Sequence, residues 1–234
     1  MKELFKKFKK ITNDLIIPIT YHPESLFMVK PITRQSSSLE GHSEAVLNVA
    51  FSPDSKILAS ASGDTTVRIW DIQTETPVNT CQGHKNWVLF LAWSPDAKML
   101  ASGSMDNTIR LWNPQTGEAI GEPLRGHKKW ITSLSWEPLH ARSPSKYLAS
   151  SSKDCTVKIW NCQNQSLEVS LSSHTSSVTK VIWGGQGLIY SASEDRTIKV
   201  WKPDGQFVRE LKGHGHWVNS LCLHTDYALR LVFL

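Results

Sequence analysis

Apolar and polar residues alternate along the chain in short segments that recur at regular spacing. Segments such as "AVLNVAFSP" and "WVLFLAWSP" are apolar and of strand type, and in "TTVRIW" (65–70) Val67 and Ile69 alternate with Arg68. This period of two predicts β-strands with one buried face. Turn-forming residues separate the segments, as in "SPD" at 52–54 and 94–96 and "PQTG" at 114–117. The pattern therefore predicts an all-β fold built from short strands.

The alternating segments belong to a longer repeat. Gly-His or Ser-His pairs end at His42, His84, His127, His174 and His214, in steps of 42, 43, 47 and 40 residues. Each of the first four units continues with an apolar strand, a Ser-rich strand, an Asp and a strand ending in Trp. This arrangement is typical of WD-repeat propeller blades. We expect an incomplete β-propeller, with four full blades at about 39–80, 81–123, 124–170 and 171–210 and a partial fifth at 211–234.

One set of polar residues returns in every full unit. The turn after the Ser-rich strand is expected to place Ser60 opposite Trp70, so that the indole N–H donates to the Ser60 hydroxyl, Ser60 to His42, and His42 to Asp64. Buried polar groups require such partners, because an unpaired group costs about 1–3 kcal/mol. The predicted structural tetrads are His42/Ser60/Asp64/Trp70, His84/Ser102/Asp106/Trp112, His127/Ser150/Asp154/Trp160 and His174/Ser191/Asp195/Trp201.

The same residue types raise the alternative of Ser-His-Asp catalysis. A single active site is not normally built four times at regular spacing, and no G-x-S-x-G nucleophile elbow is present. We therefore assign no catalytic residue, no cofactor and no enzyme activity. His214 and His216, with His224 nearby, have metal-ligand chemistry, but His214 already fits the repeat, so we assign no metal. Cys155, in a hairpin turn, and Cys162, after a strand, are also given no role.

Charge and composition restrict the class of partner. The net charge is +5, but "MKELFKKFKK" (1–10) carries +4 of it, so charge alone does not mark the rest of the chain as a nucleic-acid binder. The four cysteines lack C-x-x-C spacing, which indicates reduced thiols in a cytosolic or nuclear protein. No apolar run approaches the ~20 residues of a membrane span. Leu4, Phe8, Ile11 and Leu15 have near-helical spacing, typical of a solvated basic helix or of a membrane-surface or nuclear-import segment.

Three tryptophans mark a candidate binding face. In a propeller, the loops before the first strands and the turns between the second and third strands share one face. Trp87, Trp130 and Trp217 come directly before the first-strand Val or Ile. Met105, Lys153 and Glu194 occupy the turns beside them. Each Trp could instead pack on a neighbouring blade, but three on one rim favour partner binding.

Longer motifs carry a more specific resemblance. "TRQSSSLEGHSEAV", "GHKKWITSLSWEPLH", "WGGQGLIYSASEDRTIKVW" and "GHGHWVNSLCLHTDYALR" resemble the Notchless family of WD-repeat assembly factors of the large ribosomal subunit. The resemblance covers about residues 16–230. It implies a non-catalytic scaffold in the nucleus and nucleolus whose partners are pre-ribosomal proteins, with ribosomal RNA as a further candidate, and no membrane.

The family has a ubiquitin-like domain before an eight-bladed propeller. That domain is grasped by the AAA-type ATPase midasin through a carboxylate that completes a metal site. Residues 1–30 are expected to hold a basic segment and a remnant of this domain, and residues 31–234 the blades. Because most of the ubiquitin-like domain is missing, no residue is assigned the carboxylate, and midasin coupling is not expected here. We expect a truncated product or a fragment of a longer protein.

The sequence leaves two alternatives to the ribosome-assembly scaffold. A propeller can present substrates to a ubiquitin ligase or bind a peptide as an adaptor. A degraded duplicate without function is the third possibility.

Overall fold

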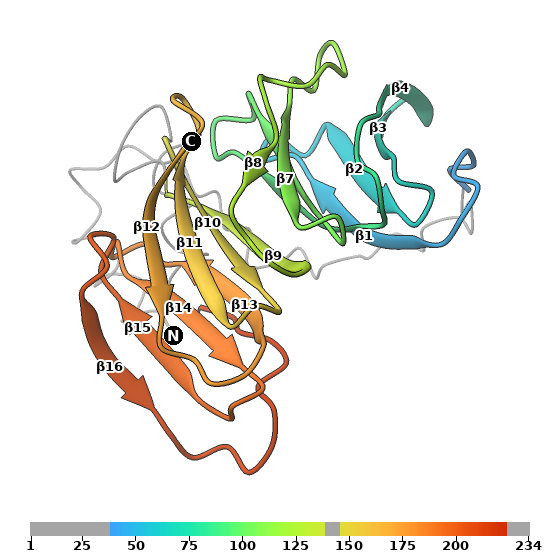
Figure 1. Cartoon of the computed structure of the whole chain (residues 1–234). Coiled ribbons are helices and arrows are strands. Elements are labelled where there is room, and N and C mark those ends of the chain that lie inside the picture. The colour runs from blue at the N-terminus through green and yellow to red at the C-terminus, as the bar shows by residue number, and fades with distance from the viewer. Residues whose placement is uncertain (1–37, 139–145, 224–234) are drawn as a thin grey trace, which may run out of the picture. The chain divides into compact units, whose positions relative to one another are not determined.

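A computed structural model describes residues 38–138 and 146–223. In these ranges sixteen strands form four antiparallel four-stranded sheets, each hydrogen-bonded in sequence order, and each sheet is one propeller blade (Figure 1). Blade one contains β1 Val46–Phe51, β2 Ile57–Ser62, β3 Val67–Asp71 and β4 Thr76–Cys81. Blade two contains β5 Val88–Trp93, β6 Leu100–Ser104, β7 Thr108–Trp112 and β8 Leu124–Arg125. Blade three contains β9 Ile131–Trp136, β10 Tyr147–Ser152, β11 Thr156–Asn161 and β12 Ser166–Ser172. Blade four contains β13 Val178–Trp183, β14 Ile189–Ser193, β15 Ile198–Trp201 and β16 Phe207–Leu211. The predicted all-β propeller class is confirmed.

The fourth strand of each blade was not anticipated from the sequence. These strands, β4, β8, β12 and β16, pair with the Trp-bearing strands. Blade two has the shortest, with two residues and a separate bridge between Trp112 and Ala119. Most side chains of β4 and β12 are exposed or only partly buried. Such strands need few apolar residues, so their sequences do not show the pattern that predicts a strand.

Tight turns join the second and third strands of each blade. Thr65, Asn107, Cys155 and Arg196 occupy the same position in these turns, with φ between 67° and 68°. This left-handed conformation is uncommon for residues other than glycine, with Asn among the better tolerated. The turn therefore has a fixed shape in all four blades, whatever residue stands there.

Neighbouring blades pack face to face through apolar side chains. Small residues of one blade, such as Ala59 and Ala61, share a core cluster with large residues of the next, such as Leu91 and Trp93. The indole of Trp93 also donates to the Ala50 carbonyl of blade one at 2.9 Å. The indole of Trp136 donates at 2.9 Å to the equivalent carbonyl of Ala92. Burial and a repeated inter-blade hydrogen bond thus fix each sheet against its neighbour.

The inner strand of blade one is not covered in this way. Val46, Val49 and Phe51 are 50%, 55% and 62% exposed. Their counterparts in the later blades are all buried: Val88, Leu91, Trp93, Ile131, Leu134, Trp136, Val178, Val181 and Trp183. At the other end, residues 212–223 contain no assigned strand, yet Val218 is buried and its N–H donates to the Ser193 carbonyl at 3.1 Å. The uncovered apolar face of the described blades therefore includes β1.

Some predictions lie outside the described residues. These are the basic segment with Leu4, Phe8, Ile11 and Leu15, the ubiquitin-like remnant within 1–30, and His224. Residues 139–145, between β9 and β10 in the sequence, are also outside the described ranges. Across the two described ranges, no helix is long and apolar enough to span a bilayer.

Candidate functional site

The structure brings the four residues of each predicted tetrad together. In blade one, His42 Nδ1 lies 2.8 Å from Asp64 Oδ2, and His42 Nε2 lies 2.7 Å from Ser60 Oγ. The indole N–H of Trp70 donates to the same Ser60 oxygen at 2.8 Å. The contacts recur in blades two, three and four at 2.7–3.0 Å. The participants there are His84/Ser102/Asp106/Trp112, His127/Ser150/Asp154/Trp160 and His174/Ser191/Asp195/Trp201.

The direction of every hydrogen bond follows from the chemistry of its two ends. An ionised carboxylate only accepts, so the His Nδ1–H donates to Asp. The bare Nε2 then accepts from the Ser hydroxyl, which in turn accepts from the indole N–H. A single neutral tautomer therefore satisfies the buried polar atoms of the chain Trp–Ser–His–Asp.

The register of the strands corrects one detail of the prediction. Ser60 is opposite Arg68, and Trp70 is opposite Leu58. The Trp therefore reaches its Ser diagonally across the β2–β3 pair. Long side chains can bridge such diagonal positions in an antiparallel pair. The same diagonal holds in blade three, where Ser150 pairs with Lys158 and Trp160 with Leu148.

A threonine completes each network and was missed by the sequence reasoning. In blade one, the backbone N–H and the hydroxyl of Thr66 both donate to Asp64 Oδ1, at 3.0 and 2.7 Å. Asp64 Oδ2 also accepts from the backbone N–H of Ser43 at 3.1 Å. The equivalent threonines are Thr108, Thr156 and Thr197. The signal was available, since every unit reads Asp-x-Thr.

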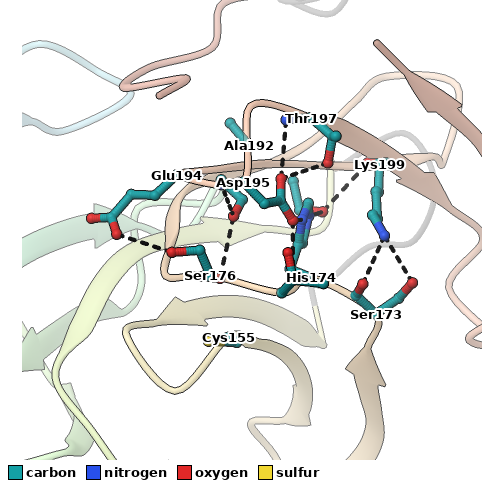
Figure 2. A network of polar contacts seen from close by, with 12 residues as sticks. Cys155, Ser173, His174, Ser176, Ala192, Glu194, Asp195, Thr197 and Lys199 are labelled. Carbon is teal, nitrogen blue, oxygen red and sulfur yellow. Dashed lines mark hydrogen bonds and ion pairs between the residues drawn. The ribbon is translucent and has the colours of Figure 1, made fainter. Parts of the chain in front are cut away.

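These donors control the ionisation of the carboxylates. Burial alone would raise the pKa of Asp64, but hydrogen bonds from Thr66 and His42 hold that pKa well below its usual range. In blade four, burial opposes the donors Thr197 and His174, which still lower the pKa of Asp195 to about 2. Figure 2 shows Asp195 between these two donors.

Burial raises the pKa of a carboxyl group but lowers the pKa of an imidazole, because it disfavours the charged form of each. Burial lowers the pKa of His127 and His174, and it outweighs the opposing hydrogen bonds from Asp154 and Asp195. Both rings are therefore neutral near pH 7. This matches the tautomer that the hydrogen bonds require.

The tetrads are poorly suited to nucleophilic catalysis. Ser102, Ser150 and Ser191 are fully buried, so no substrate carbonyl can reach their hydroxyl oxygens. Each oxygen also accepts an indole hydrogen bond, which occupies a lone pair that a nucleophile would use. A cleft of about 490 Å³ lies at the opposite end of blades one and two, and its lining includes Asp54, Asp96 and Lys98 but no tetrad residue. The geometry favours an architectural role.

We call the surface made by residues 42–45, 84–87, 127–130 and 174–177 and by the turns 63–66, 105–108, 153–156 and 194–197 the hairpin face. In each blade a backbone hydrogen bond joins loop to turn, as between Met105 N–H and the Trp87 carbonyl at 2.9 Å. The corresponding bonds are Gly63 to Ala45, Lys153 to Trp130 and Glu194 to Ser177. The loops and turns therefore form one joined surface in each blade.

The predicted tryptophans are exposed. Trp87 and Trp130, on the hairpin face, are 47% and 39% exposed, and Trp217, in the equivalent position after blade four, is 55% exposed. The ammonium group of Lys153 lies 4.4 Å from the centre of the Trp130 ring. A Cβ placed on Gly63 would lie 3.5 Å from the indole of Trp87, so this ring rests on the blade-one turn. The two rings are thus positioned by neighbouring groups while still offering apolar surface.

The predicted turn residues are half-buried beside them. Met105, Lys153 and Glu194 all have intermediate exposure. Glu194 accepts a hydrogen bond from the Ser176 hydroxyl at 3.2 Å, which Figure 2 shows. Cys155 lies in the turn and Cys162 follows β11, as expected.

The alternative metal reading gains no support from the described part of the chain. His214 and His216 are exposed, and the ring of His216 packs against Trp217. No group of three His, Cys, Asp or Glu side chains within residues 38–138 and 146–223 is arranged to hold a metal ion.

Comparison with known protein families identifies the repeat. The family described as "WD domain, G-beta repeat" matches residues 33–71, 75–113, 118–161 and 165–202. Each of the last three matches begins close to the outer strand of one blade and ends at or near the Trp strand of the next. The sequence repeat and the structural blade are therefore offset by one strand.

Individual relatives extend the similarity over most of the chain. The chain is 50% identical to "Protein Notchless" of Drosophila melanogaster over 221 residues, 94% of this chain and 45% of that protein. It is 54% identical to the "Notchless protein homolog" of Arabidopsis thaliana over 182 residues, 78% of this chain and 38% of that protein. It is 53% identical to "Ribosome assembly protein 4" of Saccharomyces cerevisiae over 220 residues, 92% of this chain and 43% of that protein. The chain thus spans less than half the length of these relatives.

Proposed function

The chain belongs to the WD-repeat family, and we propose that it acts as a non-catalytic scaffold in assembly of the large ribosomal subunit. The observation that carries the proposal is the 53% identity over 92% of the chain to a protein named for ribosome assembly. The buried tetrad Ser hydroxyls support the non-catalytic part, because a substrate cannot reach the Ser oxygen of these Ser-His-Asp sets. We further propose that the protein acts in the nucleus and nucleolus, the location expected for this role.

The proposed docking surface is the hairpin face together with Trp217. Exposed indoles are unfavourable in water, and Trp is enriched where interfaces gain most of their energy. Trp87 and Trp130 lie on adjacent blades, so one partner can cover both. Met105, Lys153 and Glu194 would form the half-buried rim of this surface. The proposed partners are pre-ribosomal proteins, with ribosomal RNA as a second class. We include no midasin contact, because no residue of this chain is assigned the metal-completing carboxylate.

Sedimentation tests the proposal. The tagged chain is expressed in cells, and lysates are separated on a sucrose gradient. Co-migration with precursors of the large subunit is expected, and it should disappear when those precursors are depleted. Recovery with ubiquitin-ligase subunits and absence from the particle fractions would support the adaptor alternative instead.

A further inference from the structure

Lysines concentrate on the hairpin face of blades two and three. Lys85, Lys128 and Lys129 are exposed in the loops that precede β5 and β9, and Lys153 lies in the turn between β10 and β11. The two blades pack together, and the side-chain amide of Asn107 donates to the Lys128 carbonyl at 3.4 Å. The four lysines therefore stand on neighbouring loops and turns of the same face.

The carboxylates nearby only partly balance this charge. Asp106 and Asp154 are ionised, but each is held inside its tetrad. Their Oδ2 atoms accept from the backbone N–H of Lys85 and of Lys128, at 3.0 and 2.9 Å. The remaining carboxylates of the face stand on the flanking blades, as Glu44 in blade one and Glu194 in blade four. The face thus has a basic centre with acidic flanks.

The two central indoles lie among these lysines, but neither ring is free on both sides. The Lys153 ammonium covers the Trp130 ring, and the Trp87 ring rests against Gly63. The Glu44 carboxylate also approaches Gly63, because a Cβ there would lie 2.6 Å from Glu44 Oε2. Single-stranded nucleic acid needs open ring faces for base stacking and a path without carboxylates for its phosphates. This face provides neither around Trp87.

A protein segment fits these features better. Side-chain carboxylates can pair with Lys85, Lys128 and Lys129, and an apolar side chain can pack on the exposed parts of the two indoles. The acidic flanks would disfavour any longer polyanion that runs past the centre. We propose that the hairpin face of blades two and three binds an acidic protein segment anchored by an aromatic or aliphatic side chain. This inference rests on the proposed docking role of the same face.

The test uses the full chain and a fluorescent synthetic peptide in which Glu alternates with Phe. Anisotropy is expected to show binding that weakens as salt is added, because exposed charges are screened. The double variant Lys128→Glu/Lys129→Glu should lose about tenfold or more in affinity, because attraction becomes repulsion. The matched control Lys56→Glu/Lys98→Glu reverses two exposed lysines in turns at the opposite end of the blades and should bind as wild type.

Two results would overturn the inference. One is equal peptide affinity of the hairpin-face variant and the control variant. The other is stronger binding of a single-stranded oligouridylate than of the peptide, with loss of that binding in Lys128→Glu/Lys129→Glu. Gradient sedimentation of the same variants separates the two proposals. If wild type and both variants all co-migrate with the particles, the scaffold function stands and the acidic partner is wrong.

Discussion

At the scale of single residues, the account depends on buried polar atoms that have one arrangement of partners. Each tetrad Ser joins an indole donor to an imidazole acceptor, so its hydroxyl cannot be replaced by an apolar group without leaving both unpaired. This explains why Ser is found at 60, 102, 150 and 191, where an Ala would fill the space.

Substitution of a tetrad Ser should therefore be costly. Ser102→Ala is expected to lower the free energy of unfolding by about 2 kcal/mol, because Trp112 Nε1 and His84 Nε2 lose their partner in a buried site. Urea denaturation measures the change. The control is Ser43→Ala, at an exposed position where only the backbone N–H is bonded, and it should be nearly neutral. Equal effects of the two substitutions would argue against the network.

Acid should weaken the same networks in two stages. His127 and His174 have a pKa lowered by burial from 6.5, so below about pH 6.5 the unfolded chain binds protons that the folded chain does not. The tetrad carboxylates have a pKa lowered from 3.8, so a second loss follows as the pH falls below about 4. Denaturation across this range should show stability falling with each step. A free energy of unfolding that stays constant from neutral pH to below 6.5 would contradict the first stage.

Backbone strain offers a change in the favourable direction. Cys155 has φ of 67°, where blade two has Asn107 at the same turn position. Because Asn tolerates this conformation better than Cys, Cys155→Asn should raise the free energy of unfolding by about 0.5–1 kcal/mol. Thermal denaturation under reducing conditions measures it. Cys222→Asn, at an exposed position, controls for loss of a thiol, and a lower melting temperature of Cys155→Asn than of wild type would refute the strain argument.

At the scale of elements, equivalent strands of different blades have similar sequences but differ in how far they are buried. Val49 of β1 and Val181 of β13 occupy equivalent positions, but Val49 is 55% exposed and Val181 is fully buried. The difference arises because β13 packs on β9, whereas no described blade precedes β1. Sequence alone does not distinguish these two valines.

A matched pair of substitutions tests this difference. Val181→Ala should cost about 2 kcal/mol through lost burial and a residual cavity. Val49→Ala should change stability by less than about 0.5 kcal/mol. Chemical denaturation of both variants decides the matter. An equal loss would mean that the β1 face is covered in solution.

The same scale shows what the sequence could and could not predict. Alternation and turn residues were sufficient for the first three strands of each unit, and the repeated His, Ser, Asp and Trp were sufficient for the tetrads. The outer strands β4 and β12 were missed because exposed strands carry little apolar signal. The pairing of Ser60 with Arg68 was missed because register depends on the turn, in which Thr65 adopts a positive φ. The fifth partner, Thr66, was overlooked although the Asp-x-Thr pattern was visible.

At the scale of the whole molecule, four blades of the same architecture present a surface whose residues differ from blade to blade. The tetrads occupy the interior of every blade in the same way, so specificity must come from positions that differ between blades. On the hairpin face these are Ala45, Trp87, Trp130 and Ser177 and the turn residues Gly63, Met105, Lys153 and Glu194. Blades that share one architecture but differ in their loop residues are the arrangement expected of a binding scaffold.

The most direct test is gradient sedimentation of a hairpin-face variant. Trp87→Ala/Trp130→Ala removes both exposed indoles on adjacent blades, whereas the control Leu167→Ala/Val208→Ala shortens two exposed apolar side chains on the outer strands β12 and β16. The account predicts that the control co-migrates with large-subunit precursors as wild type does, while the double Trp variant moves to the top of the gradient although circular dichroism shows that it is still folded. Full co-migration of the double Trp variant would contradict the claim that this face docks the protein.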